Sequence, residues 1–484
     1  MTVRSQRGRR GSDKTAHQAD RLTRADSVAR GTDARALAPL ESHAEFAPGA
    51  RDPIGLLLEQ NTTRVPELVP IRHGRMLASP FAFYRGAALP MAADLATTPT
   101  SGLRVQLCGD AHLSNFGAFA SPERRVVFDV NDFDETLPGP FEWDVKRLAA
   151  SVAVAGRENG FSRKQCRKGV LAAVERYRTA MQAFAGQHFL DVWYAQLDVE
   201  DAIREFKSQV KPKRVKATEK MVAKAHTHDS MQALKKLTTV VDGQHRIIST
   251  PPLIEPLDEL AGGHQAAATI QEMLGGVLAK YRRTLQSDRR HLLEYFTLAE
   301  VARKVVGVGS VGTRAWILLM DGHDGTAPLF LQAKEAQESV LAGYCGHSKY
   351  KQHGERVVAG QHLMQAESDI FLGWTHVIDP DPDSGGVDRD YYVRQLKDWK
   401  FSVPIERTSH KGLRGYAGMC GWTLAHAHAR SGDRIALAAY LGDSDTFAHA
   451  VADFAETYAD QNELDYQAFQ TAANTGQVEA VMGT

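Results

Sequence analysis

The chain has 484 residues, and its 58 basic (Lys plus Arg) and 58 acidic (Asp plus Glu) side chains give a formal net charge of zero. Hydrophobic residues make up 43% and charged residues 24%, which excludes a chain disordered throughout and disfavours a protein bound mainly to nucleic acid. The four cysteines form no C-x-x-C pair and no run of 18 apolar residues occurs, so we expect a cytoplasmic protein without a membrane span.

The N-terminal residues predict a tail. Residues 1–40 contain nine basic and four acidic side chains and almost no large apolar ones. Such a segment buries too little apolar surface to offset the entropy lost on ordering it. We therefore expect a disordered basic tail over residues 1–50, followed by globular sequence.

The next part of the chain is predicted to be rich in helices. Short apolar segments indicate strands at 104–107 and 125–130, and amphipathic helices are expected at 162–185 and 265–286. Residues 207–236 carry nine basic against two acidic side chains. This segment is either a basic groove for a phosphate-bearing substrate or a solvated helical face.

From about residue 300 the pattern changes to strands joined by turns, and helices return near the C-terminus. The expected elements are strands at 305–306, 315–320 and 328–333, a turn at 321–325, a helix at 352–366, a strand at 391–396 and helices at 416–430 and 446–471. The chain then divides into the tail, a helical lobe at 51–300, a small strand-rich lobe at 301–400 and returning helices at 401–484.

The strongest chemical signal lies in the loop after the strand at 104–107. Its sequence from residue 108 is CGDAHLSNFG, with Asp110 and Asn115 five positions apart. In phosphoryl transfer, an aspartate orients or deprotonates the attacking hydroxyl, and an asparagine oxygen binds Mg²⁺. We interpret His112, between them, as a structural hydrogen-bonding residue.

A second acidic block follows the strand at 125–130. Asp132 and Asp134 supply hard oxygen ligands, which Mg²⁺ requires where it bridges nucleotide phosphates. A third acid, Asp144, stands near the start of a helix. Its carboxylate either braces the loop at 108–117 by accepting backbone N–H bonds or is an ordinary acid of a helix N-terminus.

Together these motifs resemble the catalytic core of aminoglycoside phosphotransferases and related kinase-like enzymes, which contain a G-D-x-H-x-x-N loop, a D-F-D type metal motif and a trailing aspartate. The blocks at 79–86 and 131–150 resemble more closely the bacterial family catalogued as domain of unknown function 2252, over nearly the whole chain beyond about residue 50. The resemblance implies ATP and Mg²⁺ as cofactors, Asp110 as a catalytic residue, and metal ligands at Asn115, Asp132 and Asp134.

A glycine-rich segment at 307–312 has the pattern G-x-G-x-x-G through Gly307, Gly309 and Gly312. A dinucleotide-binding loop opens a helix, whereas this segment opens a strand, and Lys334 stands on the strand after that. The arrangement resembles the phosphate-covering loop of kinases. Lys334 then takes the place of the lysine that contacts the nucleotide phosphates.

Three further parts follow from the same resemblance. A helical acid, Glu338 or Glu355, is expected to pair with Lys334. The strand at 391–396 is expected to be the hinge strand against which an adenine stacks. The segment 421–433 resembles the helix that normally leads into the catalytic loop.

Because the catalytic loop precedes the nucleotide-binding module, we expect a circularly permuted, two-lobed, protein-kinase-like α+β fold. The expected activity is ATP- and Mg²⁺-dependent phosphoryl transfer to a small-molecule or protein acceptor. Three alternatives stay open: a nucleotidyltransferase of the same fold, a non-catalytic nucleotide-binding pseudoenzyme, and metal-dependent hydrolysis through Asp110, His112 and Asp132. The last leaves Lys334 and the glycine-rich segment without a role.

Overall fold

The computed structural model describes residues 23–49, 51–200, 230–261, 264–323, 328–378, 388–396 and 399–483. It is a mixed α+β fold with antiparallel sheets. The helices are α1 (Arg24–Leu37), α2 (Pro53–Asn61), α3 (Val69–Met76), α4 (Pro80–Gly86), α5 (Ala88–Leu95), α6 (Phe141–Glu158), α7 (Arg163–Gly186), α8 (Phe189–Tyr194), α11 (Ser230–Leu237), α12 (Leu257–Leu260), α13 (His264–Thr284), α14 (Ser287–Leu293), α15 (Ala342–Cys345), α16 (His353–Met364), α17 (His410–Ser431), α18 (Arg434–Leu441) and α19 (Thr446–Asn474).

The strands form one large sheet and three small ones. They are β1 (Arg104–Leu107), β2 (Phe116–Ala120), β3 (Val126–Val130), β4 (Leu137–Pro140), β5 (Leu197–Asp198), β6 (Thr238–Val241), β7 (Gln244–Ile247), β8 (Ile254–Pro256), β9 (Phe296–Lys304), β10 (Ala315–Gly322), β11 (Leu329–Ala336), β12 (Gly373–Val377) and β13 (Arg389–Gln395). In the large sheet the order is β12-β13-β11-β10-β9-β8, and its pairs are antiparallel.

Most predicted elements are confirmed, among them β1, β3, α7, α13, α16, α17 and α19. The strand predicted at 305–306 is wrong in position, because β9 ends at Lys304 and residues 305–306 lead into the glycine-rich segment. The polar side chains of β9 interrupt its apolar pattern, which concealed the strand. Helix α17 begins six residues before its predicted start, where the Ser409 hydroxyl accepts a hydrogen bond from the Gly412 amide.

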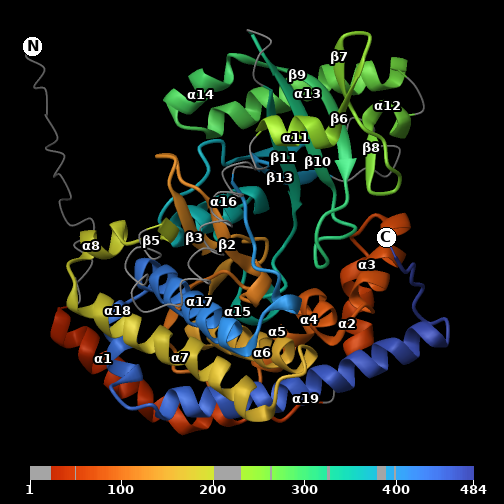
Figure 1. The fold of residues 1–484 in the computed structure, drawn as a ribbon. Coiled ribbons are helices and arrows are strands. Elements are labelled where there is room, and N and C mark those ends of the chain that lie inside the picture. Colours follow the sequence, from red (N-terminus) through yellow and green to blue (C-terminus); the bar gives the residue numbers. More distant parts are fainter. Residues whose placement is uncertain are drawn as a thin grey trace, which may run out of the picture.

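The tail prediction is wrong from residue 24 onward. Residues 24–37 form α1, which a capping box of Thr23 and Asp26 begins and which packs against α18 (Figure 1). Its contact face consists of small residues, and a Cβ added at Gly31 would lie 2.1 Å from the Ala436 carbonyl oxygen. Small residues allow this close approach without large apolar side chains, so composition did not reveal the helix. Residues 1–22 lie outside the described residues.

Each face of the large sheet has its own apolar cover. On one face, Leu318, Leu331 and Val393 pack with Tyr281 of α13 and Leu293 of α14. On the other face, a separate cluster joins strand residues to α11 and the β6–β7 hairpin; its members include Ile317, Leu319, Phe330, Leu234 and Ile247. Because successive side chains of a strand point to opposite faces, one apolar sequence supplies both clusters.

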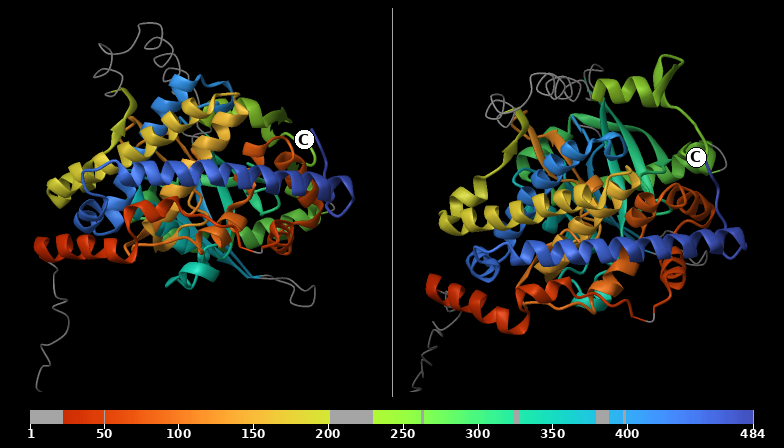
Figure 2. Two further views of the ribbon diagram at one scale, coloured as in Figure 1. Left: turned by 90° about the horizontal axis from the view of Figure 1, so that it is seen from below. Right: turned by 60° about the horizontal axis from the view of Figure 1, so that its bottom comes forward.

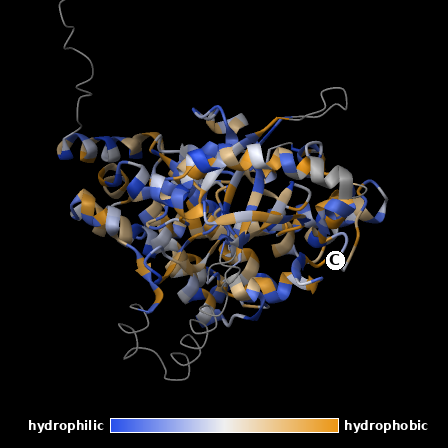
Figure 3. Cartoon of the chain, turned by 90° about the horizontal axis from the view of Figure 1, so that it is seen from above, coloured by the Kyte–Doolittle hydropathy of each residue, from blue (hydrophilic) through white to orange (hydrophobic). Residues whose placement is uncertain are grey.

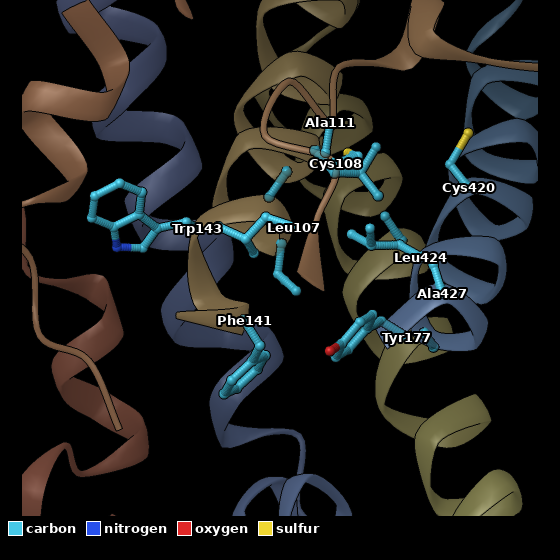
Figure 4. Close-up of a cluster of buried hydrophobic side chains, with 14 of the residues drawn as sticks. Leu107, Cys108, Ala111, Phe141, Trp143, Tyr177, Cys420, Leu424 and Ala427 are labelled. Carbon is cyan, nitrogen blue, oxygen red and sulfur yellow. The ribbon is translucent and has the colours of Figure 1, made fainter. Parts of the chain in front are cut away.

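The helical part is built from both ends of the chain. Its core combines residues of α1 and of α4 through α7 with residues of α17, α18 and α19, and α19 runs along one side of the molecule (Figure 2). In Figure 4, Phe141 and Trp143 of α6, Tyr177 of α7 and Leu424 of α17 surround Leu107 at the end of β1. The strand that leads into the motif loop is therefore anchored in the centre of this core.

The outer helices carry both hydrophilic and hydrophobic residues along their length (Figure 3), as expected for helices with one buried face. Helix α6 differs, because residues 141–156 are all buried. In the part of the chain that the structure describes, no helix combines the length and the apolar character needed to cross a membrane.

The close packing of α7 on α17 gives a stability prediction. In Gly421→Ala the new Cβ would lie 2.1 Å from the Ala173 carbonyl oxygen, so the two helices must separate. We expect a loss of about 1–3 kcal/mol in the free energy of unfolding. Gly415 lies on the same helix and is exposed with no atom near its Cβ position. Gly415→Ala should gain up to about 1 kcal/mol.

Urea unfolding of the two variants, followed by circular dichroism, measures this difference. Equal stabilities for Gly421→Ala and Gly415→Ala would contradict the described packing of α7 on α17.

Candidate functional site

The loop at residues 108–115 leaves the core at the end of β1 and turns sharply at Gly109. This glycine has a φ of +84°, and a Cβ there would lie 2.5 Å from the Glu135 carbonyl oxygen. Glycine adopts this conformation without strain, and a side chain would not fit this space. The turn therefore brings the catalytic-loop candidate directly against the acidic block at 131–135.

Helix α6 holds this loop through one face. The Asp144 carboxylate accepts hydrogen bonds from the backbone N–H groups of Cys108 (2.8 Å) and Gly109 (3.1 Å), which confirms the bracing interpretation. Two turns further along α6, the Ser151 hydroxyl accepts from the Leu113 N–H. His428 of α17 contacts Asp144 from the opposite side at 3.3 Å. The loop is fixed by its backbone, which leaves its side chains available.

Asp110 projects from the loop and is paired with Arg147, one turn after Asp144 on α6. Arg147 Nε donates to Asp110 Oδ1 at 2.5 Å and Nη2 also contacts that oxygen. Burial raises the pKa of Asp110 above its usual range, although Arg147 opposes this. His112 Nε2 lies 3.5 Å from Asp110 Oδ2, and burial, with Arg85 and Arg147 nearby, lowers the pKa of His112 well below its usual value. His112 is thus neutral, in keeping with a structural role.

A short hairpin brings the two motifs together. Strands β2 and β3 pair so that Phe116 lies opposite Val130. Asn115 immediately precedes that pair and Asn131 immediately follows it, and the Asn131 N–H donates to the Asn115 carbonyl oxygen at 2.8 Å. The Asn115 side-chain amide also donates to the Asp110 carbonyl oxygen. Sequence positions 16 residues apart thereby become neighbours.

Lys334 reaches the acidic block from β11. Its Nζ donates to Asp134 Oδ2 at 2.7 Å and lies 3.5 Å from Asp132 Oδ1. Burial alone would lower the pKa of Lys334, but the two carboxylates outweigh burial and raise it above its usual value. Tyr392 of β13 donates to Asp134 Oδ1 at 2.6 Å. Asp134 is thus satisfied on both oxygens, whereas Asp132 Oδ1 is buried without a hydrogen-bond partner.

The expected partners of Lys334 are wrong. Its ion pairs among the described residues are with Asp132 and Asp134, while Glu338 contacts His347. Glu355 lies on α16, but the residue of that helix facing the site is Arg356. Its guanidinium donates to three backbone carbonyl oxygens, those of Asp134, Thr136 and Gln337. The helix therefore fixes the backbone of the acidic block instead of supplying an acid to the lysine.

The glycine-rich segment covers the same region. Gly307 and Gly312 have φ values of +68° and +89°, which glycine adopts without strain. The Ser310 hydroxyl approaches Asp134 Oδ2 at 3.4 Å, and the Arg64 guanidinium donates to the Val311 carbonyl oxygen. The segment thus bridges the large sheet and the N-terminal helices.

These parts line one cavity of about 620 Å³, a size typical of small-molecule sites. Of the residues predicted from sequence, it is lined by Asp110, His112, Asn115, Asp132, Asp134, Gly307, Gly309 and Glu338. Lys334 is 3% exposed and lies behind the two carboxylates. The cavity thus brings together residues from opposite halves of the chain, as the sequence predicted for the motifs taken together.

The oxygen atoms of Asn115, Asp132 and Asp134 would hold a hard cation such as Mg²⁺ only together with further ligands from outside the protein. Within the described segments, no group of three or more His, Cys, Asp or Glu side chains is arranged to hold a metal ion. Mg²⁺ in nucleotide sites uses one or two carboxylates and takes its other ligands from phosphates and water. The assignment of Asn115, Asp132 and Asp134 as metal ligands therefore stays a prediction.

Sequence reasoning missed several residues of the site. Arg147, Arg356 and Tyr392 each contact a predicted motif residue or its backbone. Arg147 had a signal, since it stands three positions after Asp144 and so lies on the same face of a helix. Arg356 and Tyr392 had none, because only the tertiary fold brings them to Asp134.

Two predicted features lie partly outside the described residues. They are the basic segment, of which only residues 230–236 are described as part of α11, and the turn at 321–325 beyond residue 323. The strand predicted at 391–396 corresponds to β13.

Comparison with known proteins gives one match. The family model described as "Uncharacterized protein conserved in bacteria (DUF2252)" matches residues 64–472, most of the chain, and confirms the resemblance found in the blocks at 79–86 and 131–150. No curated protein and no solved structure matches the chain. The resemblance to kinase-like enzymes stays a prediction.

A buried acid next to the site, Asp129, leads to a prediction of how the stability of the protein depends on pH. Asp129 of β3 accepts hydrogen bonds from the N–H groups of Val130 and Ala366, and burial raises its pKa to about 7. A carboxyl group with a raised folded-state pKa contributes stability that is full below its unfolded pKa and is lost as pH rises to about 7. Asp129→Asn removes this dependence.

The free energy of unfolding of wild type, relative to Asp129→Asn, should therefore fall between pH 5 and pH 7.5. Urea unfolding at several pH values measures it. Parallel pH profiles for the two proteins would show that Asp129 is ionised in the folded state throughout this range.

Proposed function

The chain belongs to this bacterial family, and we propose that it is an ATP- and Mg²⁺-dependent phosphotransferase with a circularly permuted, two-lobed, protein-kinase-like fold. The large sheet with α16 forms the nucleotide lobe, and the helices from both ends of the chain form the catalytic lobe. The acceptor is a small molecule or a protein side chain. The family description names no activity, so the proposal depends on the site.

The order of elements in the large sheet supports the fold assignment. The glycine-rich segment joins β9 to β10, and Lys334 stands on β11, beside β10. Helix α16 and strands β12 and β13 follow along the chain. This is the strand, loop, strand, turn and strand order of a kinase phosphate-covering lobe, with the lysine on the third strand.

The proposed circular permutation is supported by the contact between the end of α17 and strand β1. The Ser431 hydroxyl, at the end of α17, accepts a hydrogen bond from the Gln106 N–H in β1. A Cβ added at Gly432 would lie 2.6 Å from a methyl carbon of Val105. The helix that resembles the lead-in to a catalytic loop therefore ends beside the strand that leads into this one, although the two are over 300 residues apart in the sequence.

One observation carries the functional proposal: the motif loop, the acidic block and the glycine-rich segment line a single cavity. Asp110 and Asp132 come from the first third of the chain, and Gly309 and Ser310 from the second half. Nothing in the packing of a structural core requires these residue types to converge on a solvent-filled space. Phosphoryl transfer in kinase-like enzymes uses residues of all these types, because it depends on positioning and charge stabilisation.

The residues present fit a metal–nucleotide complex. Asp132 Oδ1 is a buried carboxylate oxygen without a hydrogen-bond partner, which is costly unless a ligand satisfies it. Asn115 donates through its amide nitrogen, which leaves its amide oxygen for a cation. Asp134, which is hydrogen-bonded to Lys334, is the third proposed metal ligand. When bound, Mg²⁺ with ATP supplies the phosphoryl group and neutralises charge on the phosphates.

The chain's own residues then have separate tasks. Asp110 accepts a hydrogen bond from the acceptor hydroxyl at Oδ2, because Arg147 occupies Oδ1. Asp144 and Ser151 keep the loop backbone still while this happens. Lys334 holds Asp134 in place and provides a positive charge next to the phosphate-binding space. The glycine-rich segment covers that space and keeps water from it.

The metal assignment is tested with Asp132→Asn. This variant removes the longer of the two Lys334 ion pairs (3.5 Å) and keeps the 2.7 Å contact with Asp134, so it should stay folded with a modestly lower melting temperature. It should bind ATP in the presence of Mg²⁺ at least tenfold more weakly, as measured by calorimetric titration. The matched control is Asp460→Asn, which alters a surface carboxylate paired with Arg157 and 69% exposed.

Unchanged ATP affinity in Asp132→Asn would contradict the metal assignment. Product analysis separates the proposed reaction from its alternatives. Label transferred from the γ-phosphate of ATP to an acceptor indicates a phosphotransferase, and label from the α-phosphate indicates a nucleotidyltransferase. Saturable binding without transfer in either case indicates a pseudoenzyme.

A further inference from the structure

Arg85 is the feature of the cavity that the proposed reaction leaves unexplained. It lies at the end of α4, in the block at 79–86, and lines the cavity together with Asp110 and His112. Its Nε is buried without a hydrogen-bond partner, and its side chain makes no hydrogen bond or ion pair with any residue that the structure describes. A largely buried guanidinium in this state is unfavourable unless an anion pairs with it.

The other cavity-facing and nearby arginines each donate to at least one partner, although the Nε atoms of Arg64 and Arg356 are, like that of Arg85, buried without one. Arg147 pairs with Asp110, Arg64 donates to a backbone carbonyl of the glycine-rich segment, and Arg356 donates to three carbonyls around the acidic block. Arg85 is therefore not one of several loosely placed surface cations. Its position is fixed by its neighbours in α4, since Tyr84 Oη donates to the Arg147 carbonyl oxygen at 2.7 Å.

The carboxylate nearest to Arg85 is already paired. Arg147 contacts Asp110 directly, and His112 is neutral. Among the described residues, no carboxylate forms an ion pair with the Arg85 guanidinium. The groups that act on Arg85 are Asp110 and, beyond it, Glu406 and Glu158, whereas those that act on Arg64 are Glu135, Asp134 and Glu335. Arg85 thus belongs to the Asp110 side, away from the acids proposed to hold the metal.

We propose that Arg85 binds an anionic group, a carboxylate or a phosphate, carried by the acceptor substrate. The anion-binding site stands on the geometry alone, and its assignment to the acceptor rests on the proposed phosphotransferase function. A guanidinium binds both anions through paired N–H groups. An acceptor held there by its anion would bring a nearby hydroxyl to Asp110.

The apolar part of the cavity wall is consistent with a small metabolite. Leu56 and Leu89 line the cavity on the side of α2 and α5, and Tyr344 lines it on the side of α15. A site with a few polar groups on an apolar wall fixes the orientation of a small ligand. The acceptor class is therefore an anionic hydroxyl compound with an apolar portion.

The test measures anion binding without nucleotide. Thermal unfolding is followed while inorganic phosphate, or acetate as the carboxylate probe, is added at constant ionic strength in the absence of ATP and Mg²⁺. A ligand that binds only the folded state raises the melting temperature saturably. We expect this for wild type with at least one of the two anions, and a dissociation constant at least tenfold higher for Arg85→Gln.

Three comparisons make the result specific. Arg85→Lys keeps the charge but loses the paired geometry, so it should retain part of the response. Arg163→Gln removes an 83% exposed surface arginine and should respond as wild type does. Without anion, Arg85→Gln should melt at or above the wild-type temperature, because it removes a buried unpaired charge.

An equal anion response in wild type and Arg85→Gln overturns the proposal, and so does the absence of a saturable wild-type response to both anions. A lower melting temperature for Arg85→Gln without anion, restored by Arg85→Lys, also overturns it by showing a structural role. Titration of ATP with Mg²⁺ is independent of this test. Loss of nucleotide binding with Arg85-dependent anion binding would refute the proposed function and leave the anion site standing.

Discussion

The attachment of the loop at 108–115 to one face of α6 is the interaction on which the site depends. Asp144 and Ser151 accept backbone N–H bonds from the loop, and Arg147 between them pairs with Asp110. Residues spaced by three and four positions lie on one face of a helix, so a single rigid element sets the loop. Since residues 141–156 of that helix are wholly buried, the position of Asp110 is determined by the core and not by surface contacts.

The second constraint is the set of ion pairs between Lys334 and the two aspartates of the acidic block, which we call the ionic lock. Lys334 and Tyr392 satisfy both oxygens of Asp134, while Arg356 holds its backbone. Two carboxylates and a lysine buried together are stable only as a set, because removing one partner leaves an uncompensated charge. This lock joins the large sheet to the helical part of the chain. The proposed cation at Asp132 and Asp134 would lie beside Lys334, so occupation of the cavity and the contact between the two parts would be linked.

Sequence predicted the parts of the site that are local in the chain. The predicted strands β1 and β3 lead into the loop with Asp110 and into the acidic block with Asp132, and Asp144 follows from its helix. Strand β2, which pairs with β3 and brings Asn115 beside Asn131, was not predicted. The sequence could not predict the partner of Lys334, because Asp134 is 200 residues away in the sequence and reaches it only through the fold. It also missed α1, whose Gly31 packs through small residues that carry no hydrophobic signal. The periodicity of apolar residues thus identifies helices and strands. Charge pairs between distant residues and close contacts between backbones are seen only in the tertiary structure.

The arrangement of charges in the cavity connects these constraints to chemistry. On one side Asp132 and Asp134 lie beside Lys334, and Arg394 also acts on both carboxylates. On the other side Asp110 is paired with Arg147, and the Arg85 guanidinium makes no ion pair with a described residue. Carboxylate oxygens on the first side favour a cation there, and a guanidinium without an ion-pair partner on the second side favours an anion. The proposed cation-bridged nucleotide and the proposed anionic acceptor would together supply both partners.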